Sequence, residues 1–244
     1  MLILGFDTAT AACTVALVED GRLLTELTVV SPRVHSARLL PLIAQAFQEA
    51  GRDRRELAAV AAGVGPGSFT GLRIGLSAAK ALAFALGIPC VPVSTLAAIA
   101  AGLPPGSGLV APLLDAKRGE VYTALYRVEP AGEEPAGRLT ERVAPRLTEL
   151  IAPRLVPLGA WLEELDRLRD GAPVFLAGDA VPSEVPDWAV PVPDGLRLPR
   201  GWAVAALGAR AAAAGETVAP EALAPVYLRR SEAEVLWDRR HGGQ

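Results

Sequence analysis

The chain has 244 residues, of which 51% are hydrophobic and 21% are charged, and its formal net charge is −3 at pH 7. This length and apolar content suit one large domain or two small ones with an ample core. The near-neutral charge argues against a stand-alone nucleic-acid-binding protein, which would carry clustered Lys and Arg. No apolar run approaches the roughly 20 uncharged residues of a membrane span.

The start of the chain predicts a first strand and no signal peptide, because it lacks a basic region and reaches Asp7 at once. The two cysteines, Cys13 and Cys90, are far apart and form no CxxC pattern. Together these features predict a protein of the reducing cytoplasm that has no zinc ribbon.

The first part of the chain alternates apolar strands with helical stretches. The expected strands are 2–6, 13–19, 22–30, 57–62 and 88–93, and the expected helices are 35–50, 70–86 and 95–101. Asp20-Gly21 is a hairpin signal between the second and third strands. Pro41 falls inside the first helix, so either a local kink or a late helix start is expected there.

A Gly- and Pro-rich stretch at 102–108 marks a domain boundary and divides the chain into 1–102 and 103–244. Beyond it the expected strands are 109–114, 120–128, 138–144 and 173–177, the expected helices are 160–169 and 202–214, and 182–199 is expected to be irregular. Strands followed by helices, twice over, predict two α/β units that share one plan. The extended end at 224–230 leaves open that the last segment returns to the first unit.

The stretch from Gly63 to Gly75, Gly-Val-Gly-Pro-Gly-Ser-Phe-Thr-Gly-Leu-Arg-Ile-Gly, is a strand-to-helix corner. Ser68 or Thr70 can cap the helix that follows, and Gly87 can end it. Such a corner can cradle a phosphate on free backbone N–H groups, or its glycines can permit close packing. We favour packing, because no Lys-Ser/Thr pair follows the glycines as it would in a phosphate-binding loop.

The helix after this corner lacks the broad polar face of an ordinary surface helix. Its charges between 71 and 86 are Arg73 and Lys80, whereas Gly71, Gly75 and Ala79 follow one another at intervals of four. Either the helix lies deep in its own domain, or another chain covers its outer side.

Five stretches of the chain resemble the bacterial TsaB (YeaZ) family. They are Gly63 to Gly75, Phe6-Asp7-Thr8-Ala9, His35-Ser36-Ala37-Arg38-Leu39-Leu40-Pro41, Asp115-Ala116-Lys117-Arg118-Gly119-Glu120-Val121-Tyr122 and Pro225-Val226-Tyr227-Leu228-Arg229. The resemblance implies the two-lobed α/β fold of actin, Hsp70 and sugar kinases (the ASKHA superfamily), in which each lobe is a mixed sheet with flanking helices. It also implies a subunit of the machinery that places threonylcarbamoyl on the adenosine next to the tRNA anticodon.

In that family the catalytic subunit is the paralogue TsaD, and TsaB is its dimerisation partner, with the ATPase TsaE as a third member. The resemblance implies pairing through the helices of the first lobe, with a homodimer possible for the isolated chain and tRNA bound only through the complex. The partner-facing residues predicted here are His35, Leu39, Leu42, Ile43, Ala46, Gly71, Ile74, Gly75, Ala78 and Ala79.

Catalytic, metal and nucleotide sites are not expected in this chain. The catalytic paralogue binds metal through a histidine pair four residues apart on a helix, whereas His35 here is followed at that spacing by Leu39. Superfamily members bind nucleotide at a glycine-containing turn after the first strand and at a glycine-rich loop in the second lobe. Here the turn offers only Asp7, Thr8 and Thr10 as weak candidates, and the second loop offers only Gly178.

We therefore expect ATP or ADP to bind weakly at most, or through partner subunits, and we assign Asp7 a structural hydrogen-bonding role in its turn. The competing hypothesis is a stand-alone enzyme of the same superfamily, either an ATP-dependent phosphotransferase or a metallopeptidase. The charged hairpin at 115–120 is expected to be either a solvated turn or a binding site.

Overall fold

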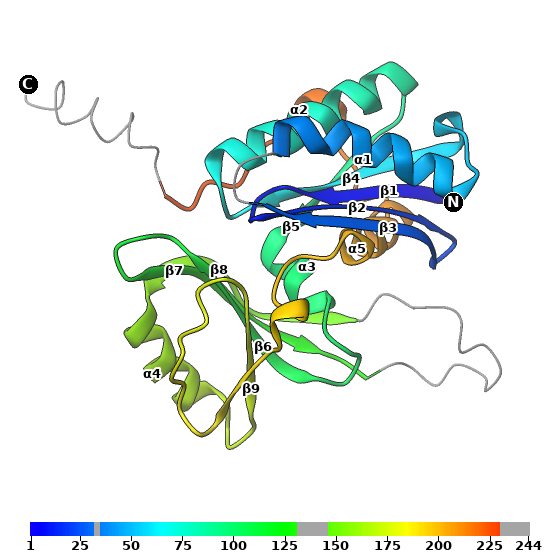
Figure 1. Cartoon of the computed structure of the whole chain (residues 1–244). Helices are drawn as coiled ribbons and strands as arrows, with labels where there is room; N and C mark the ends of the chain where they lie inside the picture. Colours follow the sequence, from blue (N-terminus) through cyan, green and yellow to red (C-terminus); the bar gives the residue numbers. More distant parts are fainter. Residues whose placement is uncertain (32–34, 131–145, 230–244) are drawn as a thin grey trace, which may run out of the picture.

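A computed structural model of the chain describes residues 1–31, 35–130 and 146–229, and it contains two five-stranded sheets (Figure 1). The first sheet has the order β3-β2-β1-β4-β5 and the second has the order β10-β9-β6-β7-β8. Each sheet mixes parallel and antiparallel neighbours. The predicted two-lobed α/β architecture, with a mixed sheet and flanking helices in each lobe, is confirmed. The predicted strand at 138–144 lies outside the described residues.

The first lobe is built on the central strand β1, which is buried on both faces. Its strands are β1 (Leu2–Asp7), β2 (Ala12–Glu19), β3 (Arg22–Val30), β4 (Leu57–Gly65) and β5 (Cys90–Ser94). Side chains alternate along β1, so Leu4 and Phe6 face the core under the first two helices while Ile3 faces the opposite core. This alternation explains why a continuous apolar run forms the middle of the sheet.

Two helices cover one face of the first sheet, α1 (His35–Ala50) and α2 (Phe69–Leu86) (Figure 1). α1 contains Pro41 and still begins at His35, so the alternative of a late helix start is wrong. The ends of α2 agree with the predictions. The Ser68 side chain accepts a hydrogen bond from the Gly71 N–H at 3.2 Å, and Gly87 closes the helix in the left-handed conformation with φ of 67°.

The second lobe places its sheet between two helices. Its strands are β6 (Gly108–Asp115), β7 (Glu120–Val128), β8 (Leu147–Pro157), β9 (Val174–Ala177) and β10 (Ala189–Pro191). Helix α3 (Thr95–Ala101) packs on one face through Leu96 and Ile99, and α4 (Leu158–Leu168) packs on the other through Trp161 and Leu165. Three short 3-10 helices complete the described elements, namely η1 (Arg54–Glu56), η2 (Asp194–Leu196) and η3 (Pro220–Ala222).

The edge strand β8 was not predicted from the sequence. It contains Pro153, and a proline inside a strand pattern argues against a strand unless it lies at an edge or a bulge. The structure has both features: among the described residues β8 pairs only with β7, and the pairing shifts register between Thr123 opposite Arg154 and Leu125 opposite Ile151. The three residues of β10 likewise lie within the stretch predicted to be irregular.

Helix α5 (Gly201–Ala213) follows the second sheet along the chain but packs on the first sheet, opposite α1 and α2 (Figure 1). Its first turn is held by side chains from β2 and β3. The Gly201 N–H donates to Thr14 Oγ1 at 2.8 Å, and the Trp202 N–H donates to Glu26 Oε1 at 3.1 Å. The chain therefore returns to the first lobe at α5, whereas the sequence left such a return open only for the last segment.

Candidate protein-interaction site

An apolar groove of about 680 Å³ runs between α1 and α2 on the outer side of the first lobe. The lining residues are Leu39, Leu40, Ile43, Ala44, Phe47, Arg54, Ile74, Ser77, Ala78, Ala81, Leu82 and Ala85. Arg54 and Ser77 are the polar residues among them, so the groove offers apolar surface with little capacity for hydrogen bonding. A surface of this kind is typical of a site where another protein docks.

Large apolar side chains are exposed on both helices, and one of them, Leu40, lines the groove. Leu40 on α1 is 63% exposed, and Phe84 and Phe69 on α2 are 79% and 40% exposed. Burying such side chains against a partner would stabilise a complex by roughly 1.5–3 kcal/mol for each one that becomes fully buried. These exposed residues were not singled out from the sequence, where only the missing polar face of the second helix was noticed.

Four of the predicted partner-facing residues line this groove, namely Leu39 and Ile43 on α1 and Ile74 and Ala78 on α2. Leu42 and Ala46 are buried instead in the core beneath the helices. His35 is the first residue of α1, and its side chain lies outside what the structure describes.

The prediction that the small residues of α2 contact a partner is wrong, because Gly71, Gly75 and Ala79 point into their own lobe. A Cβ added to Gly71 would lie 1.9 Å from the Thr8 carbonyl oxygen, and one added to Gly75 would lie 2.5 Å from Thr8 Oγ1. Ala79 is 0% exposed within the first core. The small residues let α2 approach the turn after β1 in its own lobe, so they do not form a contact surface for another chain.

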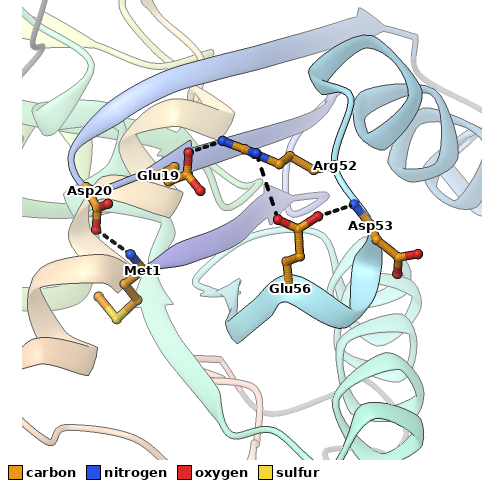
Figure 2. A network of polar contacts seen from close by, with 6 residues as sticks. All are labelled: Met1, Glu19, Asp20, Arg52, Asp53 and Glu56. Carbon is orange, nitrogen blue, oxygen red and sulfur yellow. Dashed lines mark hydrogen bonds and ion pairs between the residues drawn. The ribbon is translucent and has the colours of Figure 1, made fainter.

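The end of the groove that contains Arg54 is positioned by a polar network (Figure 2). Arg52, just after α1, binds Glu19 of β2 and lies 3.9 Å from Glu56 of η1. Glu56 accepts the Asp53 N–H at 2.7 Å, and Asp53 accepts the Arg55 N–H at 2.8 Å, which makes a capping box. These contacts attach the α1–β4 connection to the sheet.

The turn after β1, which holds the weak candidates for nucleotide binding, is filled by contacts of the protein with itself. Asp7 Oδ1 accepts the Ala9 N–H and Oδ2 accepts the Thr95 hydroxyl, both at 2.7 Å. Thr8 donates to the Gly71 carbonyl at 2.8 Å, and Thr10 accepts the Ala12 N–H at 3.2 Å. All three candidate nucleotide ligands thus have structural partners, which agrees with the structural role assigned to Asp7.

The Gly63–Gly75 corner packs against the same turn. The Ser68 N–H donates to the Ala9 carbonyl at 2.7 Å, and a Cβ on Gly67 would lie 2.4 Å from that oxygen. A Cβ on Gly63 would lie 1.9 Å from Asp7 Oδ2. The glycines of the corner therefore serve close packing, as favoured from the sequence.

The hairpin between β6 and β7 is held by its own charges. Lys117, Arg118 and Gly119 adopt positive φ, and the Asp115 carboxylate accepts the Lys117 N–H at 2.7 Å and its ammonium group at 2.5 Å. The hydrogen bond from the Lys117 side chain lowers the pKa of Asp115. Asp179 accepts the Asp115 N–H at 2.9 Å, and partial desolvation raises the pKa of Asp179 although the residue remains exposed.

Other chemistry is sparse in the described ranges 1–31, 35–130 and 146–229. No three His, Cys, Asp or Glu side chains come together there to hold a metal ion. Cys13 and Cys90 are buried, and desolvation raises the pKa of each thiol to about 11. Among these residues α2 is the one helix that could span a membrane by length and composition, but Leu72, Leu76 and Ala83 pack it into the first lobe.

Comparison with known proteins finds similarity over nearly the whole chain. The family described as TsaD, tRNA N6-adenosine threonylcarbamoyltransferase, matches residues 29–144. The tRNA threonylcarbamoyladenosine biosynthesis protein TsaB of Escherichia coli K12 is 35% identical over 249 residues, which cover 99% of each chain. TsaB of Bacillus subtilis 168 is 32% identical, covering 97% of this chain and 98% of its own.

Solved structures agree with the sequence relatives. YeaZ from Pseudomonas aeruginosa superposes with a TM-score of 0.69 at 34% identity, covering 93% of this chain and 99% of its own. A second structure, described as an uncharacterized protein with similarity to peptidase YEAZ from the same organism, gives a TM-score of 0.72 at 32% identity. The fold described above is therefore shared along almost its full length.

Proposed function

The chain belongs to the TsaB (YeaZ) family of tRNA threonylcarbamoyladenosine biosynthesis proteins, and from this premise we propose that it is a non-catalytic subunit that pairs with the catalytic paralogue TsaD through the α1–α2 groove. The observation that carries the proposal is the groove itself, an apolar surface on a lobe whose sheet is already covered on both faces. The function of the subunit would be to hold TsaD in its active assembly.

The identity of the partner rests on the similarity of the two families. The TsaD family matches residues 29–144, a range that contains α1, α2 and the strand between them. A paralogue with the same helix pair can place it against this one around a pseudo-two-fold axis. The same surface is self-complementary, so the isolated chain could also form a homodimer.

The non-catalytic role is supported by the state of the expected active-site positions. The turn at Asp7, Thr8 and Thr10 is closed by internal hydrogen bonds, and metal-binding clusters are missing from the described residues. With a net charge of −3, the chain would meet tRNA only within the complex, because affinity for the phosphate backbone depends on clustered Lys and Arg. TsaE would join as the third member, in the cytoplasm.

The deciding experiment measures pairing with purified TsaD from the same organism. Leu40→Glu and Ala81→Glu place a charge on exposed apolar positions that line the groove, where an unpaired charge in an interface costs about 2–5 kcal/mol. We expect each variant to weaken the complex at least about 30-fold in calorimetry, which corresponds to the lower end of that range. The matched control is Gln45→Glu, an exposed α1 position that does not line the groove.

Normal pairing of both groove variants would reject this surface as the interface. Catalysis needs a separate measurement, in which the isolated chain is titrated with ATP and Mg²⁺ and assayed for threonylcarbamoyl transfer to tRNA. Tight stoichiometric nucleotide binding, or robust turnover with TsaD excluded, would favour the alternative of a stand-alone enzyme.

A further inference from the structure

The C-terminal segment Ala224–Arg229 contacts both lobes of the molecule. It leaves η3 beside α2, and Figure 1 shows its last part, in orange and red, beside the N-terminal end of α2. Its contacts join this segment to two places that precede it by more than 100 residues, the Gly63–Gly75 corner and the β6–β7 hairpin.

The attachment to the first lobe combines a backbone hydrogen bond with ring stacking. The Val226 N–H donates to the Val64 carbonyl at 2.8 Å, and the Val226 carbonyl approaches to 3.2 Å from where a Cβ on Gly65 would be. The Tyr227 ring stacks on Phe69 at 5.1 Å, and the Arg73 guanidinium lies 3.9 Å from the centre of the Phe69 ring. Stacked aromatic and cation–π contacts each add to the attraction of the packed surfaces.

The attachment to the second lobe is made by one side chain. The Arg229 guanidinium donates to the Ala116 carbonyl and to the Glu120 carboxylate, which belong to the two sides of the charged hairpin. The two side chains of this ion pair are 28% and 33% exposed, so water screens them only in part. The planar guanidinium can hold both acceptors at once, which a lysine could not do with the same geometry.

We propose that Ala224–Arg229 is an interlobe strap, which holds the two lobes at one closure angle by binding the Gly63–Gly75 corner on one side and the hairpin on the other. Proteins with two lobes change the angle between them by hinge motion unless contacts outside the hinge prevent it. Releasing Arg229 removes the strap's hydrogen bonds to the second lobe while leaving both cores intact. The strap thereby makes the angle between the lobes depend in part on the Arg229 side chain.

The test measures the distance between the lobes in the isolated full-length chain, so its outcome does not depend on pairing with TsaD. Spin labels are attached at Gln45→Cys on α1 and Glu163→Cys on α4, both exposed positions. Cys13 and Cys90 are buried, with thiol pKa values of about 11, so labelling is selective for the new cysteines. Pulsed electron resonance then gives the distance distribution.

We expect a single narrow distribution of the distance between the two labels in the otherwise unchanged chain. In Arg229→Ala this distribution should be broader and its mean distance should shift. Arg229→Lys keeps the charge but not the double contact, and it should broaden the distribution less. The matched control is Arg127→Ala, an exposed arginine of the second lobe outside the strap, which should change nothing. Amide exchange in the hairpin at 115–120 should also accelerate in Arg229→Ala, by on the order of tenfold, because its anchor is lost.

An unchanged distribution in a folded Arg229→Ala protein would overturn the proposal and reduce the strap to surface packing. If Arg229→Ala does not fold, Tyr227→Ala tests the same strap from the first lobe by removing the stack on Phe69. A narrow, unshifted distribution in that variant would overturn the proposal equally.

Discussion

The two faces of α2 carry similar small residues but have opposite surroundings. Gly71, Gly75 and Ala79 face inward, where the space a side chain would need is taken by Thr8 and the core under the helix. On the outer side Ser77 and Ala81 line the groove. The comparison teaches that a stripe of small residues shows where something approaches closely, but not whether the approaching group belongs to the same chain.

The strongest test of which face of α2 is packed inward is to place the same large residue on each face. Gly75→Arg should prevent folding, because even its Cβ would collide with Thr8 and a buried unpaired charge would follow. We expect a loss of more than about 4 kcal/mol in the free energy of unfolding, measured by circular dichroism with urea. A Gly75→Arg protein with a normal unfolding midpoint would show that this face is not packed as described.

Ser77→Arg is the matched substitution on the outer face, only two residues further along α2. Because Ser77 is exposed and lines the groove, the variant should fold with a change in stability within about 0.5 kcal/mol. Pairing with TsaD should nevertheless weaken by about 2–4 kcal/mol, as expected for a disrupted centre of an interface. Calorimetry with TsaD measures this, and undiminished affinity would contradict the outward assignment.

A smaller effect is expected at the turn against which the inner face packs. Thr95→Val keeps the shape of the side chain but removes the donor to the buried Asp7 carboxylate. We expect a loss of about 1–3 kcal/mol in the free energy of unfolding, because a buried acceptor is left without that partner. Thr70→Val, on the exposed first turn of α2, is the control and should be nearly neutral; equal effects in both would refute the special role of Asp7.

The smallest expected effect lies outside both faces, in the second lobe. Desolvation raises the pKa of Asp179 in the folded state. The charged carboxylate therefore destabilises the folded protein at pH values above this raised pKa. The destabilisation disappears as the pH falls below 3.8, the ordinary pKa of the group, because the carboxyl is then protonated in both states. Asp179→Asn should therefore stabilise the protein at pH 7 by less than about 1 kcal/mol, since the residue is partly solvated. This gain should vanish near pH 3.5 in urea unfolding, with the exposed Asp187→Asn as control.

Much of the fold could be predicted because its signals are local. Ser68 and Gly87 mark the ends of α2 by chemistry that acts within one turn, and each acts as expected. β8 could not be predicted, because whether a strand tolerates Pro153 depends on its place at the sheet edge. The return of α5 to the first sheet depends on Thr14 and Glu26, which are more than 170 residues away in sequence.

The candidate site could be predicted only in part for the same reason. Apolar spacing identified the two helices and residues such as Ile43 and Ile74, which line the groove. Which side of α2 faces outward depends on the turn after β1. Thr8 of that turn bonds to Gly71 of the helix, 63 residues further along the sequence. The exposed Leu40 and Phe84 look like core residues in the sequence and become recognisable only when their exposure is known.

The return of α5 also determines when the first lobe can be completed during synthesis. Until residues 201–213 have left the ribosome, the face of the first sheet that carries Ile3, Ala59 and Val91 lacks the helix that packs most extensively on it. Domains generally fold as units while the chain grows from its N-terminus. Here the sheet whose last strand ends at Ser94 must wait for a helix that begins at Gly201, so its apolar face is exposed to chaperones and to aggregation while the residues between them are made.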